Sequence, residues 1–341
     1  METDKLFGKP VLYGGGIMQE VKWGVLGTAN IARGCTIPGM KLSESCELYA
    51  IAGRSINKAE SFKEEFGFEK AYGSYEELIE DPEVQAVYVP LPNDLHCKWV
   101  TAALKKGKHV LCEKPLGLNA EEVRQMHKTA ADNGVYLMEA YAYLHSPYIA
   151  SLKKDINEGV IGDVDYIESA FITQGYKEDI RLHKDQGGGA MYDLGCYCTT
   201  MILSLIDSEP DLVKACAEYS DFGVDLMTAA IIRFKNGVRA SFNVGMILEK
   251  DSDKRYDRLY VHGSKGFIRS EVQYNQDGEV SYMISTENGT TERTVSVPQN
   301  YSLETEQLSR CILYGEKPLV TPEFSIRNAS LMDRVLSEMG Y

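Results

Sequence analysis

The chain has 341 residues, of which 44% are hydrophobic and 25% are charged. This composition is typical of a globular protein, and the length exceeds that of one typical domain, so we expect two domains. Acidic residues outnumber basic ones by 50 to 36, which gives a formal net charge of −14. Such a charge repels nucleic-acid backbones and anionic membrane surfaces, so we expect neither as a partner.

The first residues and the cysteines bear on the cellular compartment. Residues 1–20 carry acids early and a Gly14-Gly15-Gly16 run, without the long apolar core of a secretory signal. We treat them as an N-terminal extension, with Met18 as a candidate start. No segment reaches the roughly 20 consecutive apolar residues of a membrane span. The eight cysteines lack metal-ligand spacing, so we expect buried reduced thiols, no metal site and a cytoplasmic protein.

Residues 21–140 alternate short apolar runs with helix-like segments. Strands are expected at 21–26, 48–52, 86–89, 109–112 and 135–138. Helices are expected at 57–66, 94–106 and 119–132, and a short one opens at the capping box Ser74-Tyr75-Glu76-Glu77. Helices between strands are the crossovers of a parallel sheet, so the pattern predicts an α/β Rossmann domain with a doubly wound sheet over 21–140.

The first expected strand runs into Gly27-Thr28-Ala29-Asn30-Ile31, where a helix begins. A dinucleotide-binding fold places its pyrophosphate against the free amides at this point. Gly27 fits the first position of the G-x-G-x-x-G pattern, whereas alanines stand at the second and third positions. We expect this loop to bind a cofactor; a plain strand-to-helix turn is the alternative.

The end of the second expected strand lacks the acidic residue that usually binds the ribose hydroxyls of NAD. Arg54, Ser55 and Lys58 stand there instead. A guanidinium, a hydroxyl and an ammonium suit a 2′-phosphate, so we favour NADP over NAD. The alternative is an exposed arginine beside a helix cap.

Lys114 directly follows the strand expected at 109–112, at the carboxyl edge of the sheet where doubly wound folds bind ligands. Pro115 restricts the backbone after it, and Glu113 can pair with or orient the ammonium. A surface lysine at the end of a buried strand is the alternative, which these residues alone leave open.

Beyond residue 140 the pattern changes, and we expect a second domain over 141–341. Asn236-Gly237 predicts a type I′ hairpin turn between two of its strands. Helices are expected at 147–159, 191–206, 302–314 and 322–339, and strands at 163–174, 226–234, 238–246, 256–262, 266–269, 281–286 and 291–297. This order predicts an α+β domain with a large open, mostly antiparallel sheet.

Three segments carry a family resemblance: YGSYEEL at 72–78, AVYVPLPNDLH at 86–96 and GKHVLCEKP at 107–115. They resemble the Gfo/Idh/MocA oxidoreductases, and WGVLGTANIA at 23–32 is similar to the branch with trans-dihydrodiol and D-xylose dehydrogenases. The resemblance implies a Rossmann domain, a second domain whose sheet forms a subunit interface, a nicotinamide cofactor, and sugar, cyclitol or polyol substrates. It also implies cofactor contacts by Pro92, Asn93, His96, Glu113 and Lys114.

The segment from Gly187 to Tyr197 is similar to a GGGxxxDxGxH stretch of the family, with Tyr197 in place of the histidine. Asp193 and Tyr197 are four residues apart, so on a helix they share one face. The resemblance implies that Tyr197 is the acid/base, Lys114 its activator and Asp193 a positioning group. A free tyrosine, with a pKa of about 10, ionises little at neutral pH, and a nearby ammonium favours the phenolate. Helix capping by Asp193 and packing by Tyr197 are the alternatives.

The family pattern breaks at 139–147, where Leu144 stands at a position that often holds arginine. Tyr141, His145 and Arg181 are the candidates for substrate contacts, with packing or a surface ion pair as alternatives. Three functions stay open: an NAD(P)-dependent dehydrogenase or reductase of a sugar or cyclic diol, a glycoside-processing enzyme that retains NAD(H), and a cofactor-sensing module without turnover. We expect a homodimer or higher homo-oligomer.

Overall fold

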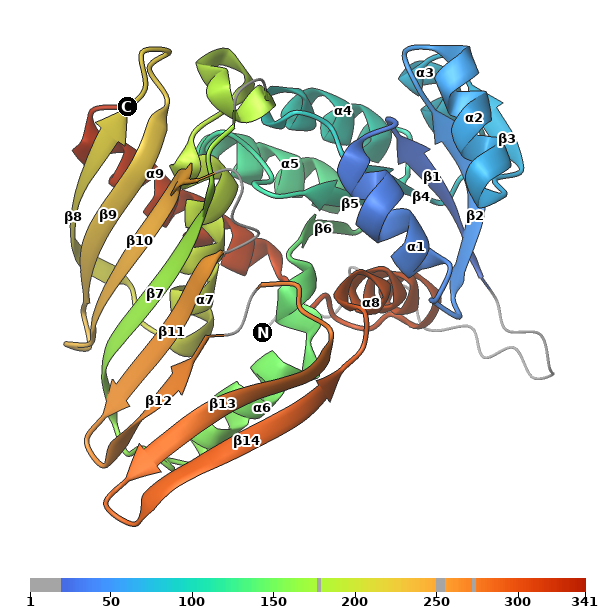
Figure 1. Cartoon of the computed structure of the whole chain (residues 1–341). Helices are drawn as coiled ribbons and strands as arrows, with labels where there is room; N and C mark the ends of the chain where they lie inside the picture. Colours follow the sequence, from blue (N-terminus) through green and yellow to red (C-terminus); the bar gives the residue numbers. More distant parts are fainter. Residues whose placement is uncertain (1–19, 177–178, 250–254, 272–273) are drawn as a thin grey trace. The chain divides into compact units, whose positions relative to one another are not determined.

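The computed structural model describes residues 20–176, 179–249, 255–271 and 274–341 (Figure 1). All but the last residue of the expected N-terminal extension lies outside these residues. The chain forms two compact units. The first comprises the residues up to 117, 121–144 and 299–325, and the second comprises 118–120, 145–298 and 326–341. The region expected as one second domain, 141–341, is therefore interrupted by a segment of the first unit.

The first unit contains a six-stranded parallel sheet in the order β3-β2-β1-β4-β5-β6, and the expected Rossmann fold is confirmed (Figure 1). The sequence does not predict β3, because its three residues are too few to show an alternating pattern. The strands are β1 (Val21–Leu26), β2 (Cys46–Ala52), β3 (Lys70–Tyr72), β4 (Ala86–Val89), β5 (His109–Glu113) and β6 (Leu137–Ala140). The helices are η1 (Ala32–Thr36), α1 (Ile37–Met40), α2 (Ile56–Phe66), α3 (Tyr75–Glu80), α4 (Asn93–Lys105), α5 (Ala120–Asp132), η2 (Ala142–His145) and α8 (Asn300–Tyr314).

Local signals fix where these helices begin and end. Ser74 Oγ accepts the Glu77 N–H at 3.2 Å and starts α3. The Glu77 carboxylate accepts the Gly73 N–H at 3.1 Å, one residue before the position that a regular capping box uses. Gly67 ends α2 with a φ of +85°, a conformation that costs glycine little.

Helix α8 belongs to the first unit because its buried face packs there. Trp23 Nε1 on β1 donates to Ser309 Oγ at 3.1 Å, and both Trp23 and Leu308 are fully buried. The Glu306 carboxylate accepts from Ser45 Oγ at 2.8 Å and from the Ser45 N–H at 3.0 Å. These contacts join α8 to the start of the parallel sheet.

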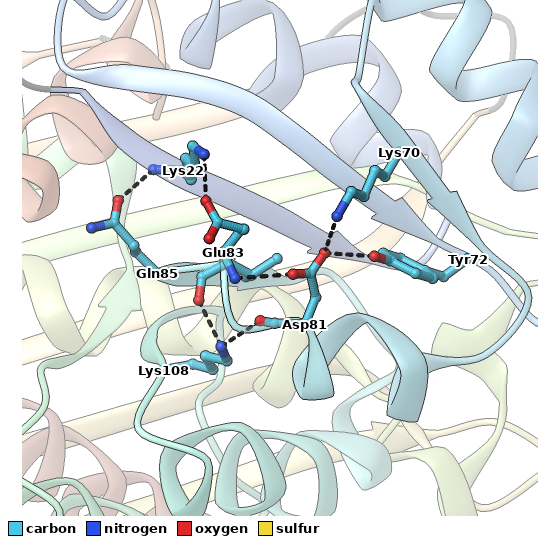
Figure 2. A network of polar contacts seen from close by, with 8 residues as sticks. Lys22, Lys70, Tyr72, Asp81, Glu83, Gln85 and Lys108 are labelled. Atoms are coloured by element: carbon cyan, nitrogen blue, oxygen red, sulfur yellow. Dashed lines mark hydrogen bonds and ion pairs between the residues drawn. The ribbon is translucent and has the colours of Figure 1, made fainter.

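A polar network closes the amino-terminal edge of this sheet (Figure 2). Asp81 Oδ2 accepts from Tyr72 Oη at 2.5 Å and from Lys70 Nζ at 2.9 Å, and Asp81 Oδ1 accepts the Glu83 N–H at 2.9 Å. Burial alone raises the pKa of Asp81, but these hydrogen bonds outweigh it and lower the pKa to about 2. The buried Lys108 ammonium donates at 2.7 Å to the backbone carbonyls of both Asp81 and Val84.

The second unit is built on an eight-stranded sheet in the order β14-β13-β12-β11-β7-β10-β9-β8. All strand pairs are antiparallel except β7–β10, so the expected mostly antiparallel sheet is confirmed. The strands are β7 (Val164–Gln174), β8 (Pro210–Tyr219), β9 (Asp225–Phe234), β10 (Arg239–Leu248), β11 (Tyr256–Gly263), β12 (Gly266–Ser270), β13 (Gly278–Thr286) and β14 (Gly289–Val297). The helices are α6 (Pro147–Asn157), η3 (Ile180–Leu182), η4 (Lys184–Gln186), η5 (Met191–Gly195), α7 (Cys196–Leu205) and α9 (Pro322–Met339), of which α9 begins in the first unit.

The turn between β9 and β10 differs from the expected type I′ turn. That type needs positive φ at both central residues, yet Gly237 has a φ of +89° and Asn236 is not among the positive-φ residues. The Gly237 N–H donates to the Phe234 carbonyl at 2.9 Å. The arrangement fits a type I turn followed by a glycine bulge, the other common way to close a short hairpin.

All eight cysteines are free thiols; five are buried, and Cys216 on β8 is exposed rather than buried. In the described ranges, no set of histidine, cysteine, aspartate and glutamate side chains is arranged to hold a metal ion. Of the helices in these ranges, none is both long and apolar enough to cross a membrane.

Candidate active site

The loop after β1 has the geometry of a phosphate-binding turn. Gly27 has a φ of +118°, and its N–H donates to the Ala52 carbonyl at 2.9 Å. A Cβ at this position would lie 3.0 Å from Leu91 Cδ2, so a larger residue would push into the neighbouring loop. Thr28, Ala29 and Ile31 are half-buried and Asn30 is exposed, and the first amides of the helix have no carbonyl four residues earlier to bind. The loop therefore fits a dinucleotide pyrophosphate.

The cations expected to recognise a 2′-phosphate follow β2. Arg54, Ser55 and Lys58 are all exposed. Ser55 is the N-cap residue of α2, but its hydroxyl makes no capping hydrogen bond. Neither Arg54 nor Lys58 forms an ion pair with another described residue. The three side chains are thus available to an anionic ligand.

Strands β1, β4 and β5 are neighbours in the sheet, so the residues after them share one edge. Pro92 and Asn93, both half-buried, start α4 after β4. His96 lies one turn further along α4 and is fully buried. Its Nδ1 is 2.9 Å from the Pro115 carbonyl and its Nε2 is 2.8 Å from the Leu91 carbonyl, so backbone groups occupy both ring nitrogens.

Glu113 ends β5 at the same edge and Lys114 follows it, and both are half-buried. Glu113 Oε1 accepts from Tyr88 Oη at 2.6 Å, and Tyr88 Oη in turn accepts from Thr36 Oγ1 at 2.9 Å. Burial and then repulsion from Glu113 raise the pKa of the nearby Glu304 well above its usual range. The Glu113 carboxylate thus lies within a hydrogen-bonded chain that runs from Thr36 through Tyr88.

In the Gly187-Gly188-Gly189 run, the second and third positions have no room for a side chain. A Cβ at Gly188 would lie 2.5 Å from the Arg181 carbonyl, and a Cβ at Gly189 would lie 2.1 Å from Asp225 Oδ1. The close approach lets the Asp225 carboxylate accept the Met191 N–H at 2.8 Å. The glycines thus bring the start of η5, and with it Asp193, against neighbouring backbone.

Arg181 and Asp193 come together in the second unit. Arg181 Nε donates to Asp193 Oδ2 at 2.6 Å, and its Nη1 donates to Asp179 Oδ1 at 2.9 Å. Although burial opposes it, the charge of Asp193 raises the pKa of Arg181. The ion pair orients the Asp193 carboxylate, and it gives Arg181 a structural partner.

Tyr197 lies on α7, with 9% of its surface exposed. Its hydroxyl accepts from Asn275 Nδ2 at 3.4 Å, and its ring packs against Phe171 and Tyr274, with centroids 5.4 and 5.1 Å away. Asn275 has a φ of +60°, which is unusual for a residue other than glycine. The backbone is held in this conformation where the Asn275 amide reaches the Tyr197 hydroxyl.

The other two candidates for substrate contacts lie in different surroundings. Tyr141 is fully buried in the first unit and hydrogen-bonds the Glu139 carboxyl. His145 is half-buried at the end of η2. Their predicted substrate contacts stay predictions, and the Tyr141 hydroxyl has a structural partner.

Sequence reasoning missed three residues that hydrogen-bond candidate side chains: Tyr88, Glu139 and Asn275. Tyr88 reads as one more apolar residue of a buried strand. Glu139 follows a strand, as catalytic residues often do, and that signal could have marked it. Asn275 precedes Gln276-Asp277-Gly278, a turn-like sequence in which asparagine accepts positive φ. Their roles depend on contacts between segments distant in sequence.

Two family descriptions match most of the chain. "Oxidoreductase family, NAD-binding Rossmann fold" matches residues 21–141, and "GFO/IDH/MocA C-terminal domain" matches residues 149–269. The chain belongs to the Gfo/Idh/MocA oxidoreductase family. The resemblance inferred from the EKP and PNDLH segments is thereby confirmed.

Similar proteins indicate the class of reaction. D-xylose 1-dehydrogenase (NADP(+)) 2 of Haloferax volcanii is 32% identical over 92% of this chain and 95% of its own. Trans-1,2-dihydrobenzene-1,2-diol dehydrogenase of Xenopus tropicalis is 30% identical over 94% of this chain and 98% of its own. The crystal structure of KijD10, a 3-ketoreductase from Actinomadura kijaniata, in complex with NADP and TDP-benzene matches with a TM-score of 0.88 at 29% identity, covering 94% and 98% of the two chains. The chain is thus an NAD(P)-dependent oxidoreductase of this family.

Proposed function

We propose that this enzyme transfers hydride between NADP and a secondary alcohol or carbonyl carbon of a sugar or cyclic diol, with Lys114 and Tyr197 as its acid/base pair. The position of Lys114 carries the proposal: it directly follows β5 at the edge that also holds Gly27 and Asn93. In an open parallel sheet this is the edge at which dinucleotides bind. The relatives named for D-xylose and dihydrodiol oxidation support the substrate class.

Each side chain has a separate task in this scheme. When bound, the nicotinamide accepts or supplies the hydride. The Tyr197 hydroxyl holds the proton that leaves or joins the substrate oxygen, and the Lys114 ammonium donates a hydrogen bond to that oxygen and favours the phenolate. Asp193, oriented by Arg181, binds a substrate hydroxyl or positions the pair.

The preference for NADP rests on Arg54, Ser55 and Lys58. All three are exposed, and no acidic residue occupies the end of β2 to bind the ribose hydroxyls of NAD. KijD10, which matches along almost the whole chain, is described in complex with NADP.

The test is a panel of aldoses, methyl glycosides and cyclic trans-diols assayed with NADP and NAD separately, by nicotinamide absorbance. We expect turnover with NADP, and we expect Arg54→Ala to raise the KM for NADP while leaving the KM for NAD unchanged. Tyr197→Phe should reduce kcat about 100-fold or more at every pH, because no general base replaces the phenolate. Full activity of Tyr197→Phe would exclude Tyr197 as the acid/base, and a preference for NAD would exclude the 2′-phosphate site.

The proposal includes a homo-oligomer formed through the eight-stranded sheet. Ile231 on β9, Ile247 on β10 and Tyr256 on β11 are 57%, 45% and 45% exposed. The strand pairing places them on one face, opposite the buried Ile232 and Phe242. Exposed apolar side chains on one sheet face are typical of an interface. Sedimentation should show a dimer or larger species that Ile231→Glu dissociates; a monomer at all concentrations would exclude it.

A further inference from the structure

The peptide group between Pro115 and Leu116 is held at both ends by buried titratable side chains. His96 Nδ1 is 2.9 Å from the Pro115 carbonyl oxygen, and Glu139 Oε1 accepts the Leu116 N–H at 2.9 Å. His96 is 0% exposed and Glu139 is 2% exposed. One peptide unit therefore lies between two buried side chains, one residue after Lys114.

Topology explains why side chains are needed here. Strand β5 pairs with β4 up to Cys112 and with β6 up to Glu113, so the ladder ends before Lys114. Buried backbone groups beyond the ladder need other partners. They come from the elements on either side of β5: His96 lies on α4, the helix that follows β4, and Glu139 lies on β6.

Among the described residues, the hydrogen-bond partners of the two ring nitrogens of His96 are backbone carbonyls. Nδ1 faces the Pro115 carbonyl and Nε2 faces the Leu91 carbonyl at 2.8 Å. A neutral imidazole donates through one nitrogen, and an imidazolium donates through both. Burial lowers the pKa of His96, while the two carbonyls raise it. In either protonation state, these contacts direct His96 toward the backbone.

The Glu139 carboxyl likewise forms hydrogen bonds within the protein. Its carboxyl holds the Leu116 N–H and a hydrogen bond from Tyr141. Burial raises the pKa of Glu139 to about 7, and the positive charge of Lys114 acts in the opposite direction. Glu139 is thus close enough to Lys114 to respond to its charge while it bonds the backbone two residues further on.

We propose that His96 and Glu139 are positioning residues that clamp the Pro115–Leu116 peptide and so fix the direction in which Lys114 leaves the sheet. This inference rests on the proposed function, in which Lys114 acts on the substrate oxygen. It gives His96 an indirect role in place of the cofactor contact that the family resemblance implies. Misplacing a catalytic group by about 1 Å costs about 100-fold in rate, so the clamp is worth a comparable factor in kcat.

The test compares Glu139→Leu and His96→Leu with Glu139→Gln, whose amide oxygen still accepts the Leu116 N–H. His127→Leu is the matched control, since His127 is another buried histidine of the first unit, on α5. We expect the two clamp variants to lower kcat by about 10- to 100-fold with little change in the KM for NADP. Glu139→Gln should restore most of kcat, and His127→Leu should keep it.

Amide hydrogen exchange of the cofactor-free protein gives a readout independent of turnover. The peptide containing Leu116 should exchange at least ~10-fold faster in Glu139→Leu, because the amide loses its buried acceptor, and should stay protected in Glu139→Gln. Unchanged exchange in a folded Glu139→Leu, or a kcat loss no larger than that of His127→Leu, would overturn the clamp. If Lys114→Met retains wild-type kcat, the proposed function is wrong. In that case kcat no longer tests the clamp, and only the exchange of the Leu116 amide does.

Discussion

Two lysines flank strand β5, and their surroundings are opposite. Lys108 precedes the strand, has 6% of its surface exposed and donates to two backbone carbonyls in the network around Asp81 (Figure 2). Lys114 follows the strand, is half-buried and stands at the carboxyl edge. At the amino edge, two backbone carbonyls accept hydrogen bonds from the Lys108 ammonium. At the carboxyl edge, the His96 and Glu139 side chains contact the backbone that follows Lys114. The first arrangement stabilises the fold, and for the second we propose a role toward a ligand.

The comparison is tested most strongly at Lys114. Lys114→Met should lower kcat/KM by about 100- to 10,000-fold, the usual range of general acid–base catalysis. The free energy of unfolding should change by less than about 1 kcal/mol, because the backbone contacts of Pro115 and Leu116 remain. Steady-state kinetics and urea denaturation of the same preparation measure both; a large stability loss with unchanged kinetics would reverse the assignment.

Asp81→Ala should give the largest loss of stability in the network. Tyr72, Lys70 and the Glu83 N–H all lose their acceptor, which we expect to cost about 3 kcal/mol in the free energy of unfolding. Turnover per folded molecule should not change. Urea denaturation at neutral pH provides the measurement, and an unfolding midpoint equal to that of the wild type would show that the network contributes no stability.

The low pKa of Asp81 fixes the sign of its pH dependence. Its folded-state pKa of about 2 lies below the unfolded value of about 3.9, so its stabilisation is complete above about pH 4 and is lost as the pH falls toward 2. The stability difference between the wild type and Asp81→Asn should therefore shrink over this interval. A difference that stays constant from pH 5 to about 2 would contradict the assignment.

Lys108→Met should have a smaller effect on stability. The substitution keeps most of the apolar volume but removes the Lys108 hydrogen bonds to the Asp81 and Val84 carbonyls, at a cost of about 2 kcal/mol. The Asp81 carbonyl keeps the Val84 N–H as a donor. The kcat should stay at the wild-type value, in contrast to Lys114→Met. A comparable loss of kcat in both variants would mean that the two ends of β5 are not functionally distinct.

The smallest effect is expected at the rim of the same network. Lys22 Nζ lies 2.7 Å from Glu83 Oε2, but their side chains are 32% and 56% exposed. Solvent screens such a pair, so Lys22→Ala should leave the melting temperature within experimental error. A clear decrease in the melting temperature would show that the exposed Lys22–Glu83 pair also contributes to the stability of the network around Asp81 and Lys108.

How far the sequence predicts this structure depends on whether a signal is local. Gly67, Ser74 and Gly107 mark helix ends that the structure places within a residue or two, because a cap acts through its own neighbours. Strand β8 is missed because one of its faces is exposed and its sequence mixes polar and apolar residues. The bonds of His96 and Glu139 to one peptide could not be predicted, since α4, β5 and β6 meet only after folding.

The placement of α8 has a consequence for synthesis of the protein. Residues 299–325 complete the first unit, yet the ribosome makes 145–298 of the second unit before them. Translation proceeds at roughly 5–20 residues per second, so strands β1 to β6 wait roughly 8–30 seconds for the helix that covers Trp23. During that interval the buried Trp23 side chain lacks the helix that packs against it. The first unit can therefore reach its complete structure only after residues 145–298 of the second unit have been made.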